Sequence, residues 1–197
     1  MHSEFSSEGE SWPSVTTILD AQPKPWLERW YCKWGRLADY KTRAASNIGT
    51  AFHKCVETNT RLPDNARVDK MFNNFVNWAD TIGLCIKEKE LHVVSDIYHY
   101  HGTFDATGTL GKSKELLIFD WKTSSAIYSD MALQMSAYAQ AYFEQSGIRV
   151  KRGIIVHVSK DKPLHKLTVK EYTLGPRLFK KFLKRLNEYR EMKEAGV

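Results

Sequence analysis

The feature that most limits the folds open to this chain is an apolar run that ends in charge, "LLIFDWKTSS" at 116–125. Leu116 to Phe119 is continuously apolar, which is typical of a central strand covered on both faces of a sheet. Asp120 and Lys122 follow directly, and their spacing of two points both side chains to one side of that sheet. The run therefore predicts an α/β fold with a charged group at the end of a buried strand.

The rest of the chain supplies the elements around that strand. Apolar spacings of three and four predict helices over 26–45, about 46–60, and 64–83, the last with Asp64 as N-cap and Gly83 as its stop. Strand-like segments follow at 86–95, 97–110 and 114–124, with a turn around "GKSK" before the third. A helix over 129–147 capped by Ser129 or Asp130, strands at 153–159 and 165–173, and a helix over 176–194 complete the order.

These elements predict a central mixed β-sheet flanked by helices, with an N-terminal helical region. The 197 residues, 42% of them hydrophobic, suffice for a single domain with a sizeable core. Within it we expect a flexible start at 1–13, a helical part at 14–85, a core at 86–175 that contains the charged strand end, and a C-terminal helix at 176–197.

A metal site is the chemistry that best fits the charged strand end. Asp105, in "GTFDATG", lies on the preceding strand within cross-strand reach of Asp120. Two close carboxylates repel, so a divalent cation between them would relieve the repulsion, and oxygen ligands favour Mg²⁺ or Mn²⁺. The alternative is a buried ion pair between Asp120 and Lys122 that ties strand ends together.

Two helices offer further polar side chains. His53 and Glu57 in "GTAFHKCVE" share one helical face, and Gln134 and Tyr138 in "LQMSAYAQAY" lie one turn apart on the helix after the charged strand. Taken alone, each pair is better explained by ordinary packing or capping. Their weight comes from occurring together with the charged strand.

In this order, "GTAFHKCVE", "GTFDATG", "IFDWKTSS" and "QMSAY" resemble the PD-(D/E)XK nuclease superfamily. The branch is the RecB-like one, which includes phage exonucleases and the mitochondrial genome maintenance exonuclease, and "WPSVTTIL" and "KPWLERW" are similar to the N-terminus of that group. The resemblance covers roughly 13–142 and implies a restriction-endonuclease-like core. Phe104 stands where the superfamily often has proline, which leaves the neighbouring carboxylate in place.

The resemblance also implies roles for individual residues. His53, Asp105, Asp120 and the Trp121 carbonyl match ligands of one or two Mg²⁺ or Mn²⁺ ions. Lys122 matches the catalytic lysine, which either stabilises the transition state or orients or deprotonates the attacking water. Catalytic roles are thus expected for Lys122, Asp105, Asp120, and for Gln134 and Tyr138 of a Q-x-x-x-Y motif; Glu57 and Glu90 are supporting candidates.

Related nucleases often carry a four-cysteine iron-sulfur clamp. The three cysteines here cannot supply one, so no iron-sulfur cluster is expected.

Nucleic-acid contacts are expected on two helices. Trp26, Trp30 and Trp34 form a stripe suited to stacking unpaired bases, although burial statistics favour a core role for tryptophan. The basic residues that interleave with that stripe are Arg29, Lys33 and Arg36. The basic residues on the outward face of the last helix are Lys180, Lys181 and Lys184. The net charge of +6 fits a polyanionic partner without requiring one.

The expected function is therefore a metal-dependent DNA exonuclease that hydrolyses phosphodiester bonds, acting on single-stranded DNA or DNA ends in recombination, replication or genome processing. The alternatives are a structure-specific or restriction-like endonuclease on the same fold, and a non-catalytic nucleic-acid-binding subunit. An intact set of Asp105, Asp120 and Lys122 argues against the last, because a binding subunit does not need so costly a cluster.

Location and partners follow from what the sequence lacks. No apolar run approaches the roughly 20 residues that span a bilayer, and the start has no secretory signal pattern. We expect a soluble cytoplasmic protein, in the host cytoplasm if the chain is viral, with no membrane partner. No phosphate-binding loop of the form GxxxxGK[ST] is present, so any helicase or recombinase that works with it is expected to be a separate protein.

Overall fold

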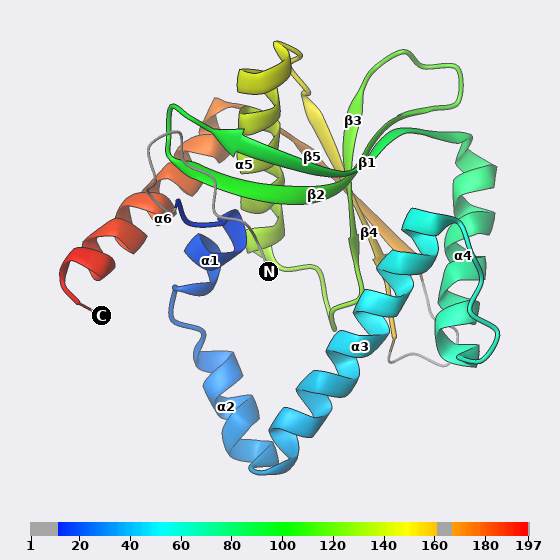
Figure 1. The fold of residues 1–197 in the computed structure, drawn as a ribbon, viewed down its shortest axis with the longest axis horizontal. Coiled ribbons are helices and arrows are strands. Elements are labelled where there is room, and N and C mark those ends of the chain that lie inside the picture. The colour runs from blue at the N-terminus through cyan, green and yellow to red at the C-terminus, as the bar shows by residue number, and fades with distance from the viewer. Residues whose placement is uncertain (1–11, 161–166, 197) are drawn as a thin grey trace.

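A mixed five-stranded sheet forms the centre of the computed structural model, which describes residues 12–160 and 167–196. Its strand order is β1-β2-β3-β4-β5, from β1 (Leu84–Ser95), β2 (Tyr100–Leu110), β3 (Leu117–Lys122), β4 (Arg152–Val158) and β5 (Leu167–Thr173) (Figure 1). β3 and β4 run parallel, and the other neighbouring strands are antiparallel. The predicted mixed sheet flanked by helices is confirmed.

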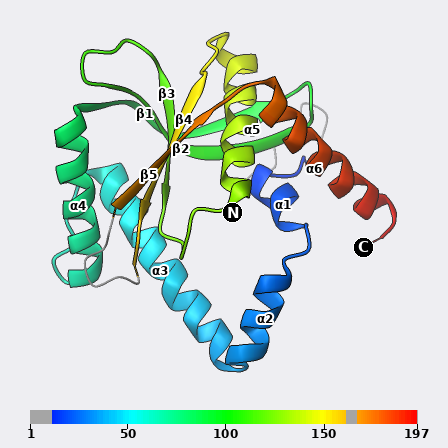
Figure 2. The same cartoon turned by 180° about the vertical axis from the view of Figure 1, so that it is seen from behind.

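Helices cover both faces of this sheet. They are α1 (Val15–Asp20), α2 (Pro25–Trp34), α3 (Leu37–Thr58), α4 (Ala66–Ile82), α5 (Ser129–Ser146) and α6 (Pro176–Glu194). One hydrophobic core joins the sheet to α1, α5 and α6, and a second joins its other face to α3 and α4 (Figures 1 and 2). α2 and the first half of α3 form a V-shaped arm that extends away from the sheet (Figure 1).

Alternation along β3 determines where its charged end points. Leu117, Phe119 and Trp121 pack in the core under α3 and α4, whereas Ile118 packs in the core under α5. Because neighbouring side chains of a strand point to opposite faces, Asp120 shares the α5 side with Ile118. Packing of β3 against the two cores on its opposite faces thus fixes the side to which the Asp120 carboxylate points.

α5 provides the crossover between the parallel strands β3 and β4. Its residues from Met131 to Ala139 are all buried, so the helix is enclosed on nearly every side instead of presenting one apolar stripe. Gly147 ends it with a positive φ of 70°, as predicted. The start differs from the prediction: Tyr128 occupies the N-cap position without a side-chain cap bond, and Ser129 is the first helical residue.

The N-terminal helices are divided differently from the prediction. A single helix over 26–45 is wrong, because Gly35, with a φ of 49°, ends α2 and a new helix runs from Leu37 to Thr58. Apolar spacing continues across this break, so periodicity could not reveal it. At α4 the N-cap is Asn65, whose side chain accepts from the Val68 amide at 3.2 Å, and not Asp64, while Gly83 is the stop as predicted.

The first described residues are held against β2. Trp12 is buried and its ring stacks on His99 with centroids 4.8 Å apart, and the Pro13 carbonyl accepts a hydrogen bond from the His101 amide. The expected flexible start therefore does not include residues 12 and 13; residues 1–11 lie outside the described part, as do 165–166 of the predicted last strand. Among the helices described, none is both long and apolar enough to cross a membrane.

Candidate active site

The two predicted carboxylates meet across the antiparallel pair β2 and β3. Ala106 pairs with Phe119, which places Asp105 beside Asp120 on the next strand. One oxygen of Asp105, Oδ2, accepts a hydrogen bond from the Trp121 backbone amide at 2.5 Å. The strand register thus brings the two aspartates side by side, as predicted, and the hydrogen bond between the strands at this point runs from the Trp121 N–H to Asp105.

Asp120 and Lys122 also lie together. Lys122 Nζ donates to Asp120 Oδ1 at 2.9 Å and lies 2.8 Å from Oδ2. The Oδ2 contact lacks hydrogen-bond geometry, so within the described residues this oxygen is buried without a hydrogen-bond partner. Because the side chain is only 3% exposed, water cannot readily satisfy that oxygen either.

Burial and charge act against each other in this pair. Burial raises the pKa of Asp120, the Lys122 charge opposes that rise, and the Asp105 charge adds to it. Burial acts to lower the pKa of Lys122, but the charges of Asp120 and Asp105 outweigh it and the lysine pKa rises. Lys122 therefore stays charged as the counter-ion of Asp120 and Asp105. One lysine cannot balance the negative charge of two carboxylates.

His53 approaches the same carboxylates from α3. Its Nδ1 lies 3.0 Å from Asp105 Oδ1, so the two oxygens of Asp105 contact a helix on one side and the Trp121 amide on the other. Burial acts to lower the pKa of His53, but the hydrogen bond to Asp105 and the charges of Asp105 and Asp120 raise it overall. The predicted convergence of the imidazole and the carboxylates is thus present.

Glu90 of β1, predicted only as a supporting residue, lies directly in the group with His53 and Asp105. Ligand atoms of His53, Glu90 and Asp105 all lie within 4.8 Å of one another, a spacing that suits a metal ion. Burial raises the pKa of Glu90, and the Asp105 charge adds to the rise. A cation at this position would stabilise the ionised form of both carboxylates.

An irregularity of the sheet brings Glu90 and Asp105 to one place. Phe104 packs in the α5 core but Ala106 packs in the α3–α4 core, although residues two apart normally share a face. The alternation of β2 therefore breaks at Asp105. Opposite it in the strand register, Glu90 has a φ of 51°, a backbone conformation that non-glycine residues adopt at a cost of about 1–3 kcal/mol.

Glu57, the other supporting candidate, has a different environment. Lys54 Nζ lies 3.0 Å from both of its carboxylate oxygens on the surface of α3. Lys89 donates to the backbone carbonyls of Val56 and Glu57, so β1 caps this end of the helix. Although Glu57 is one turn from His53, its carboxylate is outside the group that Glu90 joins.

This difference gives a testable prediction for metal binding. Changing Glu90 to Gln removes one negative ligand and should weaken Mn²⁺ binding about ten- to a hundredfold, the range seen when partners of metal ligands are lost. Calorimetric titration with Mn²⁺ measures the change, and Glu57→Gln is the matched control, expected to bind as the unchanged chain does. Equal affinities in all three proteins would remove Glu90 from the ligand set.

The predicted Q-x-x-x-Y pair lies above the strand end. Gln134 Nε2 donates to the Tyr138 hydroxyl at 2.8 Å, and both side chains are buried on α5. Burial raises the pKa of Tyr138, and the negative charge of Asp120 adds to the rise, so the hydroxyl stays protonated beside the carboxylates. Its proton is therefore available for donation to an anionic group in the site.

The predicted nucleic-acid residues are not gathered in one place. Trp30 and Trp34 are half-buried on α2, outside both hydrophobic cores, so the core role favoured by burial statistics is wrong for them. The side chain of Trp26 lies outside the described part of the structure. Arg29, Lys33 and Arg36 are exposed on and just after α2, and the Lys33 ammonium lies 5.6 Å from the Trp34 ring centroid. Lys180, Lys181 and Lys184 are exposed on α6, in the opposite helical layer from α3 (Figure 2).

The chain resembles known proteins in its structure but not in its overall sequence. No family model and no curated protein matches the chain. A candidate exonuclease from Eubacterium rectale matches with a TM-score of 0.50 at 9% identity, covering 100% of this chain and 89% of that one. A phage-related exonuclease from Haemophilus somnus matches at 0.45 and 14%, covering 94% and 96%. An alkaline exonuclease from Laribacter hongkongensis matches at 0.44 and 12%, covering 62% and 63%. The chain thus shares its fold with an exonuclease-like protein of known structure.

Proposed function

We propose that the chain is a divalent-metal-dependent DNA exonuclease of the PD-(D/E)XK superfamily, in its RecB-like branch. The observation that carries the proposal is the buried Oδ2 of Asp120, for which no described residue supplies a hydrogen bond although it lies in a group with Asp105, His53 and Lys122. A buried carboxylate oxygen without a partner is costly unless a ligand completes it. The Lys122 ammonium lies 2.8 Å from that oxygen, but the same ammonium also faces the charge of Asp105, so one lysine does not balance both carboxylates.

The donor set fits a hard divalent cation. His53, Glu90, Asp105 and Asp120, with the Trp121 carbonyl, would hold Mg²⁺ or Mn²⁺ through oxygens and one imidazole nitrogen. When bound, such an ion lowers the pKa of a coordinated water and polarises a phosphate. His53 must be neutral to bind a metal, so its raised pKa means that protons compete with the cation as the pH falls.

The remaining residues of the site act on the phosphodiester itself. Lys122 presents a positive charge at the strand end, where charge develops on the phosphate oxygens during attack. The Tyr138 hydroxyl, held by Gln134, can donate to a phosphate oxygen or to the attacking water. For exonucleolytic action in particular, support comes from the fold shared with the candidate exonuclease from Eubacterium rectale.

The test is digestion of end-labelled linear single-stranded, linear double-stranded and closed circular single-stranded DNA with Mg²⁺ or Mn²⁺. We expect linear DNA to shorten from an end while circles survive, and Asp120→Ala or a chelator to abolish the reaction. Glu191→Ala is the matched control, because Glu191 begins another carboxylate-x-lysine triplet but is exposed on α6.

Other outcomes would select the alternative functions. Cleavage of circles would identify an endonuclease. Binding of DNA without any cleavage would indicate a non-catalytic subunit and contradict the proposal.

A further inference from the structure

A groove of about 710 Å³ lies between the arm formed by α2 and α3 and the loop that follows β3. Ser124 and Ser125 line it, only two and three residues beyond Lys122. One wall of the groove is therefore formed by the loop that leads directly out of the candidate active site.

The walls of the groove are fixed relative to that site. His157 Nε2 lies 2.6 Å from the Ser124 carbonyl oxygen, which attaches the loop to β4. On the other side, α3 passes so close to the loop that a Cβ at Gly49 would lie 2.9 Å from Thr123 Oγ1. A ligand bound in the groove would consequently keep a constant position relative to Lys122.

Aromatic rings form much of this groove. Four of its described lining residues are aromatic: Trp30, Trp34, Tyr40 and Tyr128, the last of which also packs against the core under α5. Tyr40 is 73% exposed, and neither tryptophan belongs to a hydrophobic core. Large apolar surface left uncovered in this way is typical of a binding site.

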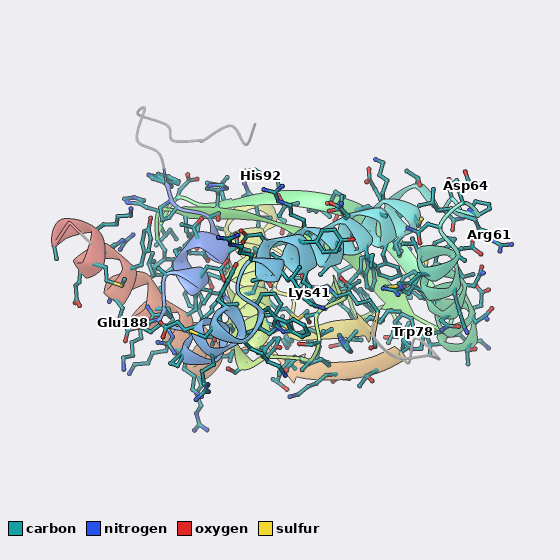
Figure 3. The ribbon with its side chains drawn as sticks, turned by 90° about the horizontal axis from the view of Figure 1, so that it is seen from below. Lys41, Arg61, Asp64, Trp78, His92 and Glu188 are labelled. Carbon is teal, nitrogen blue, oxygen red and sulfur yellow. The ribbon has the colours of Figure 1, made fainter. Side chains whose placement is uncertain are left out.

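The charged residues described in the groove are all positive. Lys41, Arg67 and Lys160 line it from three different segments, and no Asp or Glu is among the described residues of its lining. The Lys41 ammonium lies 3.8 Å from the Trp34 ring centroid, so a cation and an aromatic surface are presented together. Figure 3 shows Lys41 on α3 near the middle of this side of the molecule, well apart from Trp78.

We propose that this groove binds an unpaired segment of a polynucleotide and guides it to the strand end at Lys122. Exposed rings can stack on bases only where those bases are unpaired, and the interleaved cations neutralise the phosphates between them. A duplex keeps its base faces covered and offers only its phosphates to these cations. This inference rests on the proposed nuclease function, whose substrate it narrows to single strands.

The test measures binding without chemistry. Fluorescence anisotropy of a labelled oligothymidine, with chelator present, reports affinity for the full chain and its variants. We expect Tyr40→Ala to raise the dissociation constant about tenfold, in the range of one lost base-stacking contact, and Lys41→Gln to raise it by removing one cation that neutralises phosphate. Tyr40 is exposed enough that its removal should leave the fold intact, which a thermal melt checks.

Two controls separate this proposal from its rivals. Lys112→Gln removes an exposed lysine in the turn after β2 and is expected to bind the oligothymidine unchanged. If Lys180→Gln weakens binding and Lys41→Gln does not, the strand runs along α6 and the groove proposal is overturned. Equal loss of duplex and single-strand affinity in the groove variants would overturn the commitment to unpaired DNA.

Failure of the groove proposal and failure of the nuclease proposal give different results. Unchanged oligothymidine affinity in the groove variants, with cleavage intact, rejects only the groove. Absence of cleavage by the unchanged chain, with groove-dependent binding, rejects only the nuclease. No oligothymidine binding by the unchanged chain rejects the groove whatever the cleavage assay shows.

Discussion

Lys122→Met should lower the rate of phosphodiester cleavage by about 10²- to 10³-fold, the loss typical when one preorganised electrostatic group is removed from an active site. The Lys122 ammonium is 2.9 Å from Asp120 Oδ1 and sits at the end of a buried strand, so its charge is held at a fixed place in the site. Methionine has a similar shape, and the carboxylates that would bind the cation all remain.

Single-turnover cleavage of end-labelled DNA in saturating Mn²⁺ measures this loss. A calorimetric titration shows whether Mn²⁺ still binds, which separates a missing charge from a missing cation. A thermal melt is also needed, because removing the lysine leaves Asp120 buried without its counter-ion. Cleavage by Lys122→Met within a fewfold of the normal rate would contradict the catalytic role.

Gly102→Ala is expected to destabilise the fold by about 1–3 kcal/mol, the usual penalty for overpacking a core. A Cβ at Gly102 would lie 2.4 Å from Cε1 of Tyr138, a separation at which one group must move. Tyr138 is 2% exposed and its hydroxyl bonds Gln134, so it has little room to yield. Urea denaturation of the two proteins measures the difference in unfolding free energy.

A double-mutant cycle identifies the cause of that destabilisation. Tyr138→Leu shortens the side chain that the new methyl group would contact, so adding Gly102→Ala to it should cost clearly less than adding it to the normal chain. Additive effects would show that the strand, and not the tyrosine contact, is what the alanine disturbs. Gly175→Ser serves as a control, since no atom lies within 4 Å of a Cβ there.

The sequence predicted the sheet and the central cluster well because both depend on local patterns. A continuous apolar run identified β3, and a period of two placed Asp120 and Lys122 on one side of it, where they contact each other. His53 could be placed with the two aspartates only through the family resemblance, because helical periodicity does not show which strand a helix packs against. Each of these residues lies in a regular helix or strand.

What the sequence could not predict depends on irregular geometry and on distant segments. Glu90 was only a supporting candidate because a regular β1 gives no sign that its backbone turns to a φ of 51° opposite Asp105. The break at Gly35 was missed because apolar spacing continues through it. Arg67 and Lys160 were missed as groove residues because they come from segments far from α2 in sequence, and only the tertiary fold brings them to Trp34.

α3 connects the proposed binding groove to the candidate active site. It carries Tyr40 and Lys41 at its start and His53 near its end, so one unbroken helix sets the angle between them. Each residue of an α-helix turns by about 100°, so inserting or deleting one residue between Tyr40 and His53 would rotate the imidazole away from Asp105 or the groove residues away from the loop. Homologous chains that keep both features should therefore vary in side chains along this stretch of α3 but not in its length.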